Sequence, residues 1–418
     1  AGDTDLPGTS LTYCTTVVQR YQQMVRVGGY DLLVLDEYHE RKADQDALLG
    51  LAIRGFQQGT NPFSKLIICS ATLDVDTLAR WITGQGVTVE VVRSKGRSFP
   101  IHIEEVGTVQ EGVSVAWQMG HSVLVFQPGE AEIEQTVDLL RKQGYKRVSG
   151  YYGRMDRSEK QEALASFRSN QSILVASDAL ATGATLVPPT GITLSVVDSG
   201  LARQRVTRFG VSGFETVPAS RALMTQRAGR TGRVSDGYVW QVRSTAERPA
   251  GSTPEIQKTG LGTILLQTLQ SGVDLAALPL FESPGHAVLE DARRELLDLG
   301  LIELGQEGYA VTQLGSEAAR LSLSPRRAVM LLRAIDLGCG GTMLDYIALA
   351  ESGGLRGRRD NPADLPRSGE DWLEHQSRLM KTVQYGADVE QWRLALTQLR
   401  RSLGKDFDRI KRQTGSLD

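Results

Sequence analysis

The stretch VLVFQPGEAEIEQTVDLLRK (Val123–Lys142) decides the fold class. Its apolar run predicts a buried strand, and the amphipathic segment Glu130–Lys142 that follows at once predicts a helix. A second amphipathic segment, Ser158–Arg168, opens with a serine before a glutamate-rich first turn, as helices do. Four more apolar runs end in small or polar residues and predict buried parallel strands: LLVLDE (Leu32–Glu37), KLIICSAT (Lys65–Thr72), ILVASD (Ile173–Asp178) and ITLSVVDSG (Ile192–Gly200). This alternation predicts right-handed βαβ units, and therefore an α/β protein with a doubly wound parallel sheet that binds ligands at the carboxyl ends of its strands.

The pattern changes twice along the chain. The basic segment RSKGRSFPIHI (Arg93–Ile103) predicts a linker between two α/β domains. Beyond Ala250 the sequence predicts helices, with a wing-like strand and turn at Gly308–Gly315. Apolar residues of the tail recur at three- and four-residue spacing and predict one face of a helix: Trp392, Leu396, Leu399, Leu403, Phe407 and Ile410.

Composition limits the classes of protein that are possible. The 418 residues suffice for two or three domains, and 40% hydrophobic and 23% charged residues are usual in soluble globular proteins. A net charge of -2 gives no overall basic surface, so a nucleic-acid site would have to be a local groove. Cys14, Cys69 and Cys339 form no CxxC pair, which argues against a disulfide framework and predicts a reducing, cytoplasmic location. No stretch approaches 18 apolar residues, so no membrane association is expected.

Asp36-Glu37-Tyr38-His39 follows a predicted strand directly. An aspartate at a strand end can hold Mg²⁺, and the adjacent glutamate can orient and deprotonate a water molecule that attacks a γ-phosphate. The alternative is an acidic surface turn. Ser70-Ala71-Thr72 closes the next strand and is by itself a weak signal, since small hydroxyl residues often serve as turn or cap residues.

The most specific string is Gln226-Arg227-Ala228-Gly229-Arg230-Thr231-Gly232-Arg233. Three arginines at three-residue spacing, separated by glycines, are poorly suited to a core. They suit a cleft in which guanidinium groups reach triphosphate oxygens. A solvated basic helix start is disfavoured because Gly229 and Gly232 lower the helix propensity.

DEYH, SAT and QRAGRTGR, in this order, resemble motifs II, III and VI of superfamily 2 DExH-box helicases. GRSFPIHIEEV (Gly96–Val106) and LVFQPGEAEIEQT (Leu124–Thr136) are similar to the interdomain linker and motif IV of the DEAH/RHA group. VASDALATGATL (Val175–Leu186) is closer to motif V of viral helicases of the flavivirus, pestivirus and potyvirus type, and TYCTT (Thr12–Thr16) resembles their motif Ib. The resemblance covers roughly residues 10–350.

The resemblance implies a role for each matching residue. Asp36 would bind Mg²⁺, Glu37 would act as general base, and His39 would couple the ATP site to the nucleic-acid site. The other residues expected near ATP are Ser70, Thr72 and Gly183, with Gln226 positioning the attacking water or the γ-phosphate and Arg230 and Arg233 as arginine fingers. Contacts to the nucleic-acid backbone are expected from Thr15, Ser177 and Thr182. Backbone contacts carry little sequence information, so binding is expected to be largely independent of sequence.

Two further segments matter for function. Arg205–Phe209 and Phe214–Val217, joined by a glycine-containing turn, predict a β-hairpin. In the resembled family a hairpin at this position helps to separate strands, and the alternative is a plain surface hairpin. The phosphate-binding string GxxxxGK[ST] of the family is absent from the 418 residues, and Ser177 stands where threonine is usual in motif V. We therefore expect a piece of a longer polypeptide or polyprotein that by itself turns over little ATP.

Together these features predict an α/β fold with tandem RecA-like domains, the first incomplete, and a mostly helical C-terminal module like winged-helix and ratchet domains. The expected limits are 1–95 and 96–250 for the RecA-like domains, 251–350 for the winged-helix and bundle domain, and 351–418 for a helical tail. The implied function is ATP- and Mg²⁺-dependent translocation on single-stranded nucleic acid, with RNA expected, hydrolysing ATP in the cleft between the RecA-like domains. Two alternatives remain open: a nucleic-acid-binding or scaffold module without hydrolysis, and an NTP-driven remodeller that does not unwind duplexes.

Overall fold

The computed structural model describes residues 30–414 except 72, 94–98, 154, 156, 181–185, 209–210, 252, 259, 307, 322 and 352–386. The chain forms two compact units. The first comprises Ala1–Ser70, Asp74–Val91 and Thr253–Asp418, and the second comprises Ala71–Leu73 and Val92–Ser252. The predicted four-domain division remains a prediction, and the two units are described separately below.

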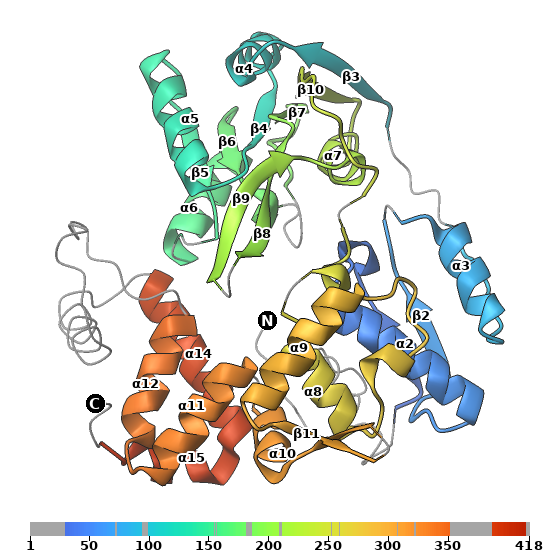
Figure 1. The fold of residues 1–418 in the computed structure, drawn as a ribbon. Helices are drawn as coiled ribbons and strands as arrows, with labels where there is room; N and C mark the ends of the chain where they lie inside the picture. The colour runs from blue at the N-terminus through green and yellow to red at the C-terminus, as the bar shows by residue number, and fades with distance from the viewer. Residues whose placement is uncertain are drawn as a thin grey trace. The chain divides into compact units, whose positions relative to one another are not determined.

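A six-stranded parallel sheet forms the centre of the second unit (Figure 1). Its strands are β3 (Ile101–Val106), β4 (Ser122–Phe126), β5 (Val148–Tyr151), β6 (Ile173–Ala176), β7 (Leu194–Asp198) and β10 (Gly237–Val242), in the order β3-β10-β7-β4-β6-β5. The chain runs outward from β4 to β5, returns through β6 and then crosses to β7 on the other side of β4. The strand order therefore reverses at β4, where ligands of open α/β sheets bind beyond the carboxyl ends of the strands.

Helices cover both faces of this sheet, and the residue pattern of β4 shows why. Val123 and Val125 belong to a core shared with α4 (Val109–Gln118) and α5 (Glu130–Lys142). Leu124 and Phe126 belong to the core on the opposite face, which α6 (Arg157–Ser169) and α7 (Arg221–Ala228) complete. Successive strand residues point to opposite faces, so a strand buried on both sides must be apolar throughout. Burial on both faces therefore explains why the sequence of β4 is a continuous apolar run.

An antiparallel hairpin leaves the carboxyl end of β7. It consists of β8 (Leu201–Arg208) and β9 (Val211–Pro218), and its register places Arg205 opposite Phe214. The predicted hairpin is confirmed, and its strands are longer than the alternation indicated. A short 3-10 helix, η2 (Asp178–Leu180), follows β6.

The N-terminal part of the first unit contains two short parallel strands and two helices. β1 (Leu32–Leu35) pairs in parallel with β2 (Lys65–Ile68), as predicted. The predicted burial of these strands is wrong, because Leu32, Val34 and Ile67 are 41%, 47% and 47% exposed. Between them lie the 3-10 helix η1 (Tyr38–Glu40) and α2 (Ala43–Gln58), and α3 (Val75–Gly84) follows. Asp74 begins α3 by accepting hydrogen bonds from the N–H groups of the first turn.

The rest of the first unit is mostly helical. Its elements are η3 (Glu255–Gln257), α8 (Gly262–Gln270), η4 (Leu275–Ala277), α9 (His286–Asp298), β11 (Ile302–Gly305), β12 (Gly308–Val311), α10 (Gln313–Ala319), α11 (Pro325–Asp336), α12 (Gly340–Glu351), α14 (Ala387–Leu403), η6 (Gly404–Asp406) and α15 (Phe407–Lys411). The antiparallel pair β11–β12 lies between α9 and α10 along the chain and is the predicted wing. Trp81 of α3 packs against Phe281 with ring centroids 5.3 Å apart, and Gly50 of α2 approaches the backbone of Pro279. Residues 253–282 therefore pack on the same core as α2 and α3.

Three predicted boundaries were wrong. The linker expected over Arg93–Ile103 overlaps β3, because Ile101 and Ile103 lie in an edge strand paired with β10. The strand and turn expected at Gly308–Gly315 end at Val311, where Thr312 begins α10 by accepting the N–H of Gly315. The single tail helix is interrupted at Gly404, whose φ of 54° lies in the left-handed region that ends helices.

No helix among the described residues is long and apolar enough to cross a membrane.

Candidate functional site

The DEYH residues lie in a tight loop at the carboxyl end of β1. The N–H of Cys69 donates to the carbonyl of Leu35 (2.8 Å), and the N–H of Tyr38 donates to the carbonyl of Cys69 (3.0 Å). The loop therefore folds over the end of β2 and stands beside Ser70. Asp36 is exposed and Glu37 is half-buried. Both carboxylates accordingly lie at the edge of the sheet where the strand pattern predicted a ligand site.

The backbone of this loop is strained at two residues. Glu37 and Arg41 have φ of 52° and 51°, and they are the only non-glycine residues of the described chain with positive φ. A left-handed conformation costs an ordinary residue roughly 1–2 kcal/mol. Such strain persists only where the surroundings fix the backbone, and it is frequent at functional sites.

His39 lies beside the Glu37 carboxylate. Its Nδ1 lies 3.4 Å from Oε2 of Glu37, with the imidazole 7% exposed and the carboxylate 47% exposed. The buried ring can orient the exposed carboxylate. The structure thus brings together Asp36, Glu37, His39 and Ser70, four residues that the sequence placed near ATP.

A buried polar cluster of Tyr38, Arg41 and Asp46 stabilises the loop. Tyr38 is fully buried and donates its hydroxyl to Oδ1 of Asp46 (2.6 Å), while Nε and Nη2 of Arg41 donate to Asp46 at 3.3 and 3.2 Å. Burial, reinforced by the charge of Asp46, raises the pKa of Tyr38 well above its usual value, so the hydroxyl stays protonated as the donor. Burial also raises the pKa of Asp46, although Tyr38 and Arg41 act to lower it. Sequence reasoning gave Tyr38 no role within DEYH and missed Arg41 and Asp46, because a charged pair five residues apart carries no motif of its own.

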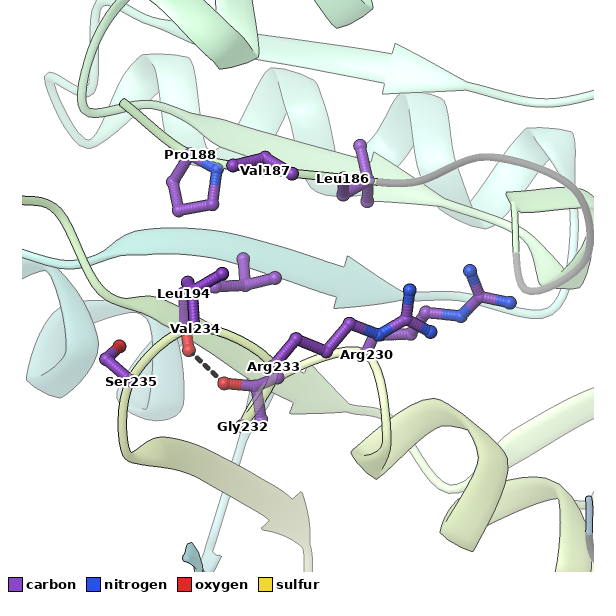
Figure 2. A pocket seen from close by; sticks show the side chains of 10 residues that line it. Leu186, Val187, Pro188, Leu194, Arg230, Gly232, Arg233, Val234 and Ser235 are labelled. Carbon is purple, nitrogen blue, oxygen red and sulfur yellow. Dashed lines mark hydrogen bonds between the residues drawn. The ribbon is translucent and has the colours of Figure 1, made fainter. Parts of the chain in front are cut away.

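The second set of predicted residues belongs to the second unit. Gln226 lies in the last turn of α7, while Arg230 and Arg233 lie in the loop that follows it. Arg230 is half-buried, and Arg233 is exposed with its Nε donating to the carbonyl of Gly229 (3.2 Å). Figure 2 shows the two arginine side chains extending in the same direction from this loop. Two cations presented side by side can contact a polyanion such as a triphosphate.

A small cavity lies beside these arginines. Its volume is about 90 Å³, and its wall is formed by Leu186, Val187, Pro188, Leu194, Arg230, Thr231, Gly232, Arg233, Val234 and Ser235 (Figure 2). Ligand pockets usually measure roughly 300–1,000 Å³. The cavity is therefore too small to hold a nucleotide by itself.

Gly232 is required by the path of this loop. Its φ is 72°, and a Cβ at this position would lie 2.8 Å from Cγ1 of Ile101 and 3.1 Å from the carbonyl oxygen of Phe99. The N–H of Phe99 donates to the carbonyl of Gly232 (2.8 Å). The glycine thus allows the arginine loop to pack directly against the chain that enters β3.

Arg227 corrects the interpretation of the three arginines as one cleft-lining set. It is fully buried, and its guanidinium donates to both carboxylate oxygens of Asp178 (2.8 and 3.0 Å), to Oδ1 of Asp198 (2.7 Å) and to the carbonyl of Leu201 (2.9 Å). It also lies over the ring of Phe126 at 5.1 Å. Burial acts to lower the pKa of Arg227, but the charges of Asp198 and Asp178 outweigh it and the pKa is raised. An arginine can occupy a core where carboxylates at strand ends pair with it, which a sequence pattern does not reveal.

Ser177, predicted to contact nucleic acid, directly follows β6. It is half-buried, its N–H donates to the carbonyl of Tyr151 (3.2 Å), and its neighbour Asp178 is held by Arg227. Four other predicted site residues lie outside the described residues: Thr15, Thr72, Thr182 and Gly183.

Comparison with known proteins gives a consistent result. Residues 108–235 match the family model "Helicase conserved C-terminal domain". The ATP-dependent RNA helicase HrpB of Escherichia coli is 31% identical over 400 residues, which are 90% of this chain and 48% of that protein. The ATP-dependent RNA helicase HrpA of Escherichia coli is 28% identical over 410 residues, which are 92% of this chain and 30% of that protein.

A solved structure extends the likeness to three dimensions. The crystal structure of E. coli DExH-box NTPase HrpB has a TM-score of 0.68 at 27% identity and covers 91% of this chain and 49% of that one. In sequence and in fold, the chain thus resembles DExH-box helicases of superfamily 2. The predicted fold class, RecA-like α/β with a helical C-terminal region, is confirmed. The chain spans between about a third and a half of the length of these relatives.

Proposed function

We propose that this chain is the part of an ATP-dependent RNA helicase that supplies the DEYH loop and the arginine loop. The observation that carries the proposal is the DEYH loop itself. It presents two carboxylates at a strand end, one of them on a strained backbone and oriented by a buried histidine. The relatives named as ATP-dependent RNA helicases support ATP as the nucleotide and RNA as the polymer.

The two carboxylates are suited to different tasks. Asp36 is exposed and offers the hard oxygen ligands that Mg²⁺ prefers, and this ion is usually bound by one or two carboxylates together with water and phosphate oxygens. When bound, Mg²⁺ would neutralise charge on the phosphates. Glu37, beside His39, would orient the attacking water and accept its proton. Ser70, at the end of the adjacent strand, would connect this loop to domain movement.

The arginine loop would stabilise charge that develops on the phosphates. Arg230 and Arg233 would donate to γ-phosphate oxygens in the transition state, and Gln226 would position the water or the phosphate. Arg227 has a different task, because its buried pairs with Asp178 and Asp198 hold α7 against the strand ends. Arg227 therefore positions the loop from which the two outer arginines act.

Nucleic acid would bind beyond the carboxyl ends of β6 and β7. Ser177 would contact the phosphate backbone, together with Thr15 and Thr182, and such contacts are largely independent of sequence. The β8–β9 hairpin would act as the obstacle that excludes one strand while the other is pulled. Its root is fixed by the bond from Arg227 to the carbonyl of Leu201.

Two assays on the full-length protein test the proposal. We expect ATP hydrolysis that single-stranded RNA stimulates and EDTA abolishes, and displacement of one strand from an RNA duplex. Glu37→Gln removes the proton acceptor and should lower kcat by about 10²-fold or more while leaving RNA binding intact. RNA binding without hydrolysis would instead indicate a scaffold. Hydrolysis without displacement would indicate a remodeller, and equal displacement of DNA duplexes would remove the preference for RNA.

A further inference from the structure

Glu255, more than 200 residues from the DEYH loop in sequence, holds the backbone that follows the loop. Its N–H donates to the carbonyl of Arg41 (3.0 Å), and its Oε2 accepts the N–H of Ala43 (3.1 Å). Glu255 of η3 thus forms hydrogen bonds with the backbone on both sides of Lys42. Both partners belong to the first compact unit.

Helix α2 depends on this contact for its N-terminal cap. Its N-cap residue is Lys42, whose side chain makes no capping hydrogen bond, and Ala43 is the first residue of the helix. The first N–H groups of a helix have no partner within the helix, and a carboxylate there also meets the positive end of the helix dipole. The Glu255 side chain provides the cap from a distant part of the chain.

Arg41 is the other anchored residue. Its left-handed backbone is held by the bond from Glu255 to its carbonyl, and its side chain is fixed by Asp46. The same guanidinium lies 3.5 Å from a carboxylate oxygen of Glu282 and 4.9 Å above the ring of Phe281. Residues 255–282 therefore contact Arg41 through both its backbone and its side chain.

The anchored helix start is connected to the carboxylates. Gln45, in the first turn of α2, donates its Nε2 to the carbonyl of Asp36 (2.9 Å). The path runs from Glu255 to Ala43, along the first turn of α2 to Gln45 and then to Asp36. Each step is a hydrogen bond or the helix backbone, so a shift at the start of α2 moves the DEYH loop.

We propose that Glu255 is a positioning residue for the DEYH loop, which it fixes through a two-point contact with the backbone of Arg41 and Ala43. This inference rests on the proposed function for its effect on catalysis, but the contact itself does not. According to this proposal, η3 helps to hold in place the carboxylates that would act on ATP.

Three substitutions in the full-length protein, with a fourth as control, separate the side-chain contact from other effects. Glu255→Ala removes the acceptor for Ala43, whereas Glu255→Gln keeps an oxygen that can accept the same bond. Ala43→Pro removes the N–H group that donates to Glu255. Proline is tolerated here because Ala43 is the first residue of the helix and the preceding Lys42 has an extended backbone. Gln257→Ala is the matched control, because Gln257 lies in the same η3 turn and its side chain donates to the carbonyl of Ser283 (3.4 Å).

Amide hydrogen exchange and steady-state kinetics are the two readouts. Glu255→Ala should accelerate exchange in the first turn of α2 by roughly tenfold or more, with Glu255→Gln and Gln257→Ala close to the parent. The same variant should lower kcat for ATP roughly tenfold with KM little changed, and Glu255→Gln should restore it. Ala43→Pro should lower kcat as well, and an unchanged urea unfolding midpoint in this variant would separate the effect from a loss of folding.

Unchanged exchange in Glu255→Ala would overturn the contact, and faster exchange with unchanged kcat in both Glu255→Ala and Ala43→Pro would overturn its positioning role. If the parent protein itself hydrolyses no ATP, the proposed function fails, while the exchange result still tests the contact.

Discussion

Arg227 ties three elements of the second unit together from a fully buried position. Its guanidinium joins Asp178 after β6, Asp198 at the end of β7 and the carbonyl of Leu201 at the root of the hairpin. Removing one partner of a buried ion pair leaves the other charge uncompensated, which costs more than the pair contributes when intact.

Arg227→Met should therefore lower the free energy of unfolding of the second unit by about 3–5 kcal/mol. Arg243→Met is the control, because the Arg243–Glu105 pair is 71% and 65% exposed, and its loss should cost less than about 1 kcal/mol. Urea unfolding of both variants measures the difference. Equal effects would show that the buried network contributes nothing beyond a surface pair.

His121 should make the second unit sensitive to acid. It is buried, its Nδ1 lies 2.9 Å from Oγ of Ser195, and its ring packs against Tyr238 with centroids 5.1 Å apart. Burial lowers the pKa of His121 below its usual value. In the unfolded chain this histidine is protonated as the pH falls through about 6.5, whereas in the folded state protonation requires a lower pH. The contribution of His121 to the free energy of unfolding is therefore fully present above about pH 6.5 and is lost as the pH falls below it.

We expect the unfolding free energy to fall less between pH 7.5 and pH 5.5 in His121→Gln than in the parent. Unfolding by urea at the two pH values checks this, and the difference between the two proteins isolates His121 from other groups that titrate in the same range. A parallel fall in both proteins would show that His121 is not the acid-sensitive group.

At the scale of elements, two helical glycines differ in their surroundings. Gly315 of α10 faces Leu301, and a Cβ there would overlap the Leu301 carbonyl oxygen and lie 2.8 Å from Cγ1 of Val311. Gly84, the last residue of α3, has no atom within 4 Å of an added Cβ. The close approach at Gly315 lets α10 pack on the β11–β12 pair, whereas Gly84 only adds freedom to the unfolded chain.

The same substitution should thus have opposite signs at the two sites. Gly315→Ala should destabilise the first unit by about 1–3 kcal/mol through overpacking. Gly84→Ala should stabilise it by about 0.5–1 kcal/mol, because alanine has the higher helix propensity. Thermal or urea unfolding measures both, and stabilisation by Gly315→Ala would contradict the packing described for α10.

At the scale of the whole molecule, the first unit joins segments from opposite ends of the chain. α2 and residues 253–282 share a core, in which Gly50 meets Leu278 and Pro279. The second unit has two cores of its own on the faces of its sheet. Each unit is thus expected to unfold as one cooperative transition.

Calorimetry of single core variants tests this. Leu49→Ala in α2 and Leu331→Ala in α11 each remove a fully buried side chain and should cost about 2–5 kcal/mol. Both should lower the same transition, and Arg227→Met should lower the other. Separate transitions for Leu49→Ala and Leu331→Ala would show that the helical part unfolds independently of α2.

The class of fold and the motifs can be predicted from the amino-acid sequence. Strands buried on both faces must be continuously apolar, and amphipathic helices must repeat near every third or fourth residue, so β4 and α5 were evident from Val123–Lys142 alone. Edge strands carry a weaker signal. β3 is largely exposed, which is why part of it was taken for a linker.

Which polar residues lie at the surface and which lie in the interior becomes known from the folded structure. Arg227, Arg230 and Arg233 are equivalent in the sequence, yet the first is buried because two strand-end carboxylates meet it, one of them 29 residues away. Likewise, nothing in the sequence distinguishes Glu255 from the other glutamates, and its contacts with Arg41 and Ala43 form through folding. Such contacts depend on where distant segments meet, and local periodicity holds no information about that, because it reports only the face that each element buries.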